Sequence, residues 1–149
     1  MALVEEVSGY LAAQVGLVAG TNLFANILPE STHAALAIFE VPSMPPQQRF
    51  GSNPLPAFTR PRLHVVTRST SSVNNGPPLP TVARGMAFNA YKALNSVTDS
   101  TLPTSTTPQR ARYMRIEPMS EPSLLELDDK GRFVFGFYCD VMRIPNSSG

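Results

Sequence analysis

The side chains that could do chemistry in this sequence are two histidines, one cysteine and a few aspartates. A serine or threonine nucleophile needs a neighbouring base, and the only imidazoles are His33, in a polar turn, and His64, within an apolar run beside arginines. We interpret both histidines as structural. Cys139 lies among aromatic residues with no cation near it in the sequence, so we expect an inert core thiol. The sequence therefore predicts a protein that is not an enzyme.

Metal and nucleotide sites also lack their usual patterns. Asp128, Asp129 and Asp140 could suggest a cation site, but the first two are explained better as turn residues. Two histidines and one cysteine form no cluster with metal-ligand spacing. Gly76 lies in a proline-rich turn and Gly85 in an expected helix, so neither belongs to a phosphate-binding loop. We expect no metal and no cofactor.

Charge is unevenly distributed along the 149 residues, although the net charge is only +1. Segments 1–48 and 116–149 are acidic, whereas segment 49–115 has nine basic residues and one acid, Asp99. These charges could neutralise one another within one domain, or they could pair between subunits of a head-to-tail ring. Only 15% of the residues are charged, against about 25% in an average globular chain. This deficit favours a surface partly covered by subunits or partners.

The elements that would position these residues begin with a strand, a turn and a helix in the middle of the chain. Apolar and polar residues alternate from Arg60 to Thr70, with the period of two of a central strand. A turn rich in serine, asparagine and proline follows. From Pro80 to Val97 apolar residues recur at helical spacing, and alanines keep one side thin enough for close packing on a sheet.

Further elements are expected on both sides of this unit. Residues 3–18 form an amphipathic helix that ends at Gly20, with acidic residues in its first turn, where the helix dipole favours them. A hairpin turn is expected from Asp128 to Gly131, where the glycine can take a positive φ. In the longest strand, Gly136 lets a neighbour approach. The strands besides that at 60–70 are expected over 34–41, 112–118 and 132–144, and a serine- and threonine-rich loop over 99–109.

These elements predict one α+β domain over residues 1–149, with a mainly antiparallel sheet of about four strands and two helices packed on one face. The loop from Pro42 to Arg60 holds five prolines and is longer than an ordinary connection. Its Phe50 and Phe58 could anchor in a partner's groove. The start of the chain lacks the basic residues of a signal peptide, and no apolar run could span a bilayer. We expect a protein made in a reducing compartment, soluble and without membrane contact.

The order of elements resembles that of the tail terminator and minor capsid (head–tail joining) proteins of long-tailed bacteriophages. The likeness rests on the first helix, Leu23, Phe24, Leu28 and Pro29, the strand ending at Glu40, the proline-led strand from Pro61 to Arg68, the alanine-rich second helix, and Asp128, Gly131 and Arg132 before the closing strand. The 42–60 loop departs from the short strand connection usual in that family.

The resemblance implies a virion structural protein that forms a hexameric ring, caps the tail tube and accepts the head connector. The implied partners are further copies of the chain, the tail tube protein and the head–tail connector protein. The implied location is the tail or neck of a virion assembled in the host cytoplasm. Double-stranded DNA would pass through the lumen without tight binding. A head-completion adaptor is a close alternative.

A small nucleic-acid-binding domain is the alternative of another class, because arginines could line a strand face and contact phosphates. The aromatic residues that interleave with bases on stacking sheets are missing from that strand. Under the ring hypothesis we expect central arginines to meet acidic residues of the next subunit. The residues predicted at subunit or partner contacts are Arg60, Arg62, Arg68, Glu5, Glu6, Phe50, Phe58, Asp128 and Arg132.

Overall fold

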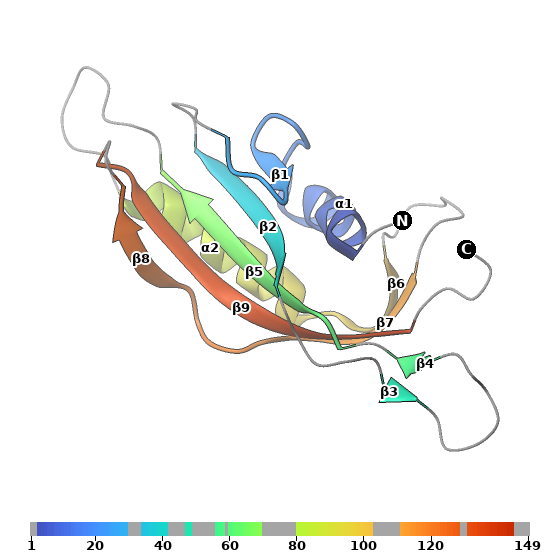
Figure 1. The fold of residues 1–149 in the computed structure, drawn as a ribbon. Coiled ribbons are helices and arrows are strands. Elements are labelled where there is room, and N and C mark those ends of the chain that lie inside the picture. Colours follow the sequence, from blue (N-terminus) through green and yellow to red (C-terminus); the bar gives the residue numbers. More distant parts are fainter. Residues whose placement is uncertain are drawn as a thin grey trace.

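The structure is a computed structural model that describes residues 3–29, 34–41, 47–48, 56–58, 60–69, 80–102, 111–128 and 131–144. Figure 1 shows two helices beside a curved sheet. The elements are α1 (Leu3–Val15), β1 (Leu23–Ala25), β2 (Ala35–Val41), β3 (Gln47–Gln48), β4 (Pro56–Phe58), β5 (Arg62–Arg68), α2 (Pro80–Asn95), β6 (Thr98–Leu102), β7 (Ala111–Pro118), β8 (Ser123–Leu127) and β9 (Phe133–Ile144). The predicted α+β class is confirmed.

The main sheet follows the order β1-β2-β5-β9-β7-β6, and β8 pairs with β9 beside the end of β7. Strand β1 pairs with β2 in parallel, and the other pairs of this sheet are antiparallel. The sheet is therefore wider than the four strands expected from the sequence. The expected loop over 99–109 is wrong at its start, because Asp99 to Leu102 belong to β6 and lie along β7. Pairing with β7 makes a strand of this polar stretch, which shows no apolar alternation in the sequence.

Strands β7 and β8 together form one interrupted partner along the same edge of β9. β7 pairs with the second half of β9, and β8 pairs with the stretch from Phe133 to Gly136. The turn between β8 and β9 closes through two backbone hydrogen bonds, from Gly131 N to Asp128 O (2.9 Å) and from Asp128 N to Arg132 O (3.0 Å). Gly131 has a φ of 72°. The predicted hairpin turn is confirmed, together with the reason for its glycine.

Both helices pack against one face of the sheet and against each other. Ala83, Ala87 and Ala90 are fully buried, which confirms the expected close approach of α2. Thr67 of β5 donates a hydrogen bond from Oγ1 to the Ala83 carbonyl (2.7 Å), and Tyr10 of α1 donates from its hydroxyl to Ala93 O (2.9 Å). α1 ends at Val15, earlier than expected, because Gly16 takes a positive φ of 72°. No helix within the described ranges is long and apolar enough to cross a bilayer.

The buried thiol of Cys139 should make stability fall with alkaline pH. Burial, with a smaller contribution from the charge of Asp140, raises the pKa of Cys139 from 9.0 to about 12. The folded state therefore keeps its proton where the unfolded chain loses it, so this stabilisation is complete below pH 9 and is lost as pH rises toward 12. Between pH 9 and pH 10 we expect the wild type to lose about 1 kcal/mol more than Cys139→Ala, measured by urea unfolding. Equal losses in both proteins would contradict an ionisable core thiol.

Candidate functional site: the helix-free face and its β8 edge

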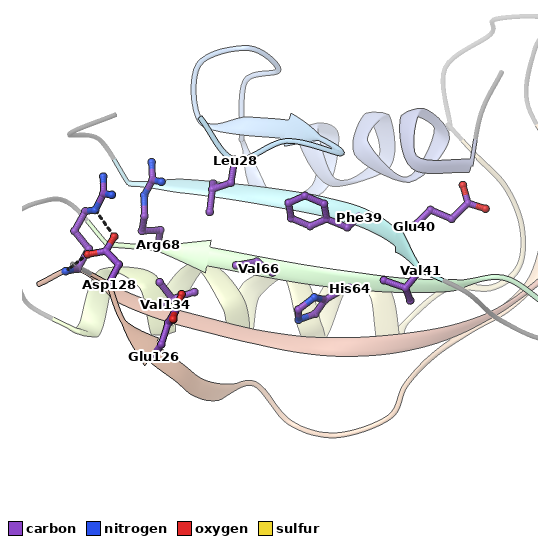
Figure 2. A pocket seen from close by; sticks show the side chains of 11 residues that line it. Leu28, Phe39, Glu40, Val41, His64, Val66, Arg68, Glu126, Asp128 and Val134 are labelled. Atoms are coloured by element: carbon purple, nitrogen blue, oxygen red, sulfur yellow. Dashed lines mark hydrogen bonds and ion pairs between the residues drawn. The ribbon is translucent and has the colours of Figure 1, made fainter. Parts of the chain in front are cut away.

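The face of the sheet that carries no helix forms a shallow, mostly apolar groove. Phe39 of β2 lies opposite His64 of β5, which in turn lies opposite Tyr138 of β9. Figure 2 shows the groove, with Glu40 toward one end and Arg68 and Asp128 at the other. Its volume is about 560 Å³, and its lining residues are Leu28, Phe39, Glu40, Val41, His64, Val66, Arg68, Glu126, Asp128, Arg132 and Val134.

His64 contributes to this face by stacking. Its ring lies 4.1 Å from the ring of Tyr138 with an angle of 6° between the planes. Its Nε2 atom is buried and makes no hydrogen bond to any of the described residues, and burial lowers the pKa of the imidazole. A neutral ring packed in this way favours the structural interpretation of His64. Sequence reasoning had placed it beside arginines, but the stack with Tyr138 follows only from the register of β5 and β9.

Strand β8 forms the open border of this face. All five of its residues are exposed, including Leu124 (51%), Leu125 (44%) and Leu127 (56%). β9 is the one described strand that pairs with it. Met119, shortly before β8, is exposed as well. An edge strand rich in exposed leucine is an aggregation hazard unless another chain covers it, so we regard this edge as the strongest candidate site.

The polar end of the groove is fixed by buried arginines. Arg132 is only 1% exposed, and its Nε donates to Asp128 Oδ2 at 2.6 Å. The Arg132 backbone N–H also donates to Asp128 Oδ1 at 2.8 Å, which ties the turn together. Arg68 is 3% exposed and donates from Nη2 to Pro29 O at 2.7 Å. These contacts tie the end of β5 to the segment after β1 and close the turn between β8 and β9.

A second buried ion pair lies on the helix side of the sheet and fastens α1 to β7 and β9. Glu6 is 1% exposed. Its carboxylate accepts hydrogen bonds from Tyr113 Oη (2.6 Å), Arg143 Nε (2.9 Å) and Arg143 Nη2 (2.9 Å). Burial, reinforced by the hydrogen bond to Glu6, raises the pKa of Tyr113. Sequence reasoning identified Glu6 only as a first-turn acid and missed both partners, which lie 107 and 137 positions away.

Several of the charged residues predicted at subunit contacts form ion pairs within the domain. Arg62 pairs with Asp140 at 3.0 Å, across the register of β5 and β9. Together with the Glu6 and Asp128 pairs, this favours neutralisation inside one fold for these charges, and arginine–acid pairing across a subunit boundary stays a prediction. Glu5 and Arg60 are exposed. Phe50 and the side chain of Phe58 lie outside the described residues.

A scan of the sequence against protein-family models finds no match, and a search of curated proteins finds none. Among the described residues, no three histidine, cysteine, aspartate or glutamate side chains cluster in a way that could hold a metal ion. The helix-free face and the β8 edge therefore have to be interpreted from their own geometry and from the order of elements.

Proposed function

We propose that this chain is a virion structural protein that assembles into a ring, caps the tail tube of a long-tailed bacteriophage and joins it to the head connector. The observation that carries the proposal is the leucine-rich β8 edge beside a sheet face without helices. A ring of identical copies gives each such edge a neighbour and leaves none open, because closed cyclic assemblies satisfy every repeated contact.

The composition of the surface supports assembly over a free monomer. The described part of the chain exposes Met119 before β8 and three leucines within it, whereas only 15% of all residues are charged. Interface cores are depleted of charged residues and tolerate large apolar side chains. A head-completion adaptor would need the same properties, so it remains a variant of this proposal.

The nucleic-acid alternative receives less support from the placed arginines. Arg62 pairs with Asp140, and Arg115 pairs with Glu117 at 3.3 Å. A carboxylate beside a guanidinium offsets the charge that would attract a phosphate, and phosphate contacts supply most of the affinity for DNA. This arrangement suits a lumen that lets double-stranded DNA pass without holding it.

Deletion of the coding sequence from the phage that carries it tests the proposed function. We expect DNA-filled heads and separate tails of irregular length, with infectious particles restored when the wild-type chain is supplied from a plasmid. Gly85→Ala, an exposed helix substitution with open space around the added methyl group, should restore them equally well. Normal numbers of joined, infectious particles after deletion would contradict the proposal.

A further inference from the structure

Two elements lie at opposite ends of the main sheet: a separate pair of short strands and the edge strand β8. Strands β3 and β4 pair with each other in a separate two-stranded sheet, which we call the arm. The arm lies between β2 and β5, at the end where Arg62 faces Asp140 of β9, and β4 contacts β9. β8 pairs near the other end of β9, opposite Val134. Figure 1 shows the arm and β8 at opposite ends of the molecule. Asp140 lies six positions along β9 from Val134, which is about 20 Å in an extended strand.

We infer that the β8 edge of one copy receives the arm of the next copy as an added strand. This inference rests on the proposed ring and names the contact that builds it. Strand addition suits β8 because its outer backbone groups face away from β9, and its exposed leucines offer apolar contacts beside them. The arm suits it because it is already extended and lies outside the main sheet.

Charge complementarity favours the arm over a second β8 as the occupant. Residues 116–129 contain five acids and no base, and Glu121 and Glu126 of that stretch are exposed. Residues 42–61 contain two arginines and no acid, and Arg60 is exposed. Pairing β8 with β8 would bring like charges together, which destabilises a strand pair. The arm itself is uncharged, but the two arginines that flank β4 in the sequence, Arg49 and Arg60, would come near the acids of the β8 stretch.

The placement of the two elements also fixes the kind of symmetry. A contact between two different surfaces is head-to-tail, and it forms a closed ring when the rotation between copies closes. Each copy would then give its arm to one neighbour and receive an arm from the other. The arm and β8 lie at opposite ends of one sheet, so one copy can make both contacts at once.

A mixing experiment tests this contact. One variant carries Leu124→Lys and Leu127→Lys, and the other has residues 42–60 replaced by a glycine–serine linker. Each variant alone should be monomeric by size exclusion with light scattering. An equimolar mixture of the two should form dimers, because the first variant supplies an intact arm and the second an intact β8 edge. Val18→Lys with Val82→Lys is the matched control, since both sites are exposed (57% and 42%) and belong neither to β8 nor to the arm. The control should assemble like the wild type.

A charge exchange at two exposed residues keeps the inference testable if either of the larger variants misfolds. Glu126→Arg and Arg60→Glu should each weaken association at least tenfold, and the double variant should recover most of that loss. If each mixing variant alone still forms normal rings, the arm contact is wrong and the ring proposal stands. If the equimolar mixture stays monomeric, the arm contact is wrong as well. A wild-type chain that is monomeric at every concentration would instead overturn the ring itself.

Discussion

Replacement of Arg143 by methionine should lower the free energy of unfolding by about 3–5 kcal/mol, the largest loss expected from a single substitution in this domain. The change leaves the Glu6 carboxylate buried. Of its two described hydrogen-bond partners, only the Tyr113 hydroxyl would remain. A buried charge without its counter-ion has lost its hydration and gains little in return. Urea unfolding at neutral pH measures the loss.

Two controls separate the loss of an ion pair from the loss of packing. Arg62→Met breaks the pair with Asp140, whose side chains are 37% and 43% exposed, and it should cost at most about 1 kcal/mol. The double variant Glu6→Leu with Arg143→Met removes both buried charges and should recover most of the stability that Arg143→Met loses. If Arg143→Met costs no more than Arg62→Met, the Glu6 site does not hold α1 to the sheet.

The second large effect is expected from two glycine-to-alanine substitutions with opposite signs. At Gly136 a Cβ atom would lie 2.9 Å from the backbone oxygen of Val65 and 2.7 Å from Leu125 Cδ1. Because the backbone of β5 cannot rotate away as a side chain can, Gly136→Ala should cost about 1–3 kcal/mol. At Gly85, within α2, the added atom would meet nothing within 4 Å.

Gly85→Ala should therefore stabilise the domain by about 0.5–1 kcal/mol, since alanine loses less backbone entropy than glycine in a helix. Thermal unfolding of both variants beside the wild type gives the comparison directly. A Gly136→Ala protein that melts with the wild type would show that β5 and β9 can separate freely at this point, contrary to the packing described here.

Most of the regular elements could be predicted because their burial follows a simple period. Buried Leu63 and Val65 alternate with half-buried Arg62 and His64 in the first part of β5, and the buried alanines of α2 recur on one face. The roles of Gly131 and Gly136 were also predictable. A tight turn requires a positive φ, and a close approach between strands leaves no space for a Cβ atom, and glycine meets both requirements. β6 was not predicted because its residues are mostly polar. It is extended because it pairs with β7, which the local sequence does not indicate.

The ion pairs of the site could not be predicted because their partners come from distant elements. Arg143 and Tyr113 reach Glu6 only after the sheet and α1 have packed together. Arg132 follows a polar turn and would ordinarily be solvated, yet its side chain is 2% exposed beside Asp128. The exposure of all five β8 residues could not be predicted either, because a leucine-rich segment is ordinarily expected to be buried.

The mass of the assembled protein tests the central claim most directly. Native mass spectrometry of the purified wild-type chain, with negative-stain electron microscopy of the same sample, distinguishes a closed ring from a monomer or an open chain. The proposal predicts a single major species of six times the 16.1 kDa chain mass, seen as a ring with a central hole. A monomer at all concentrations, or filaments without closure, would contradict it.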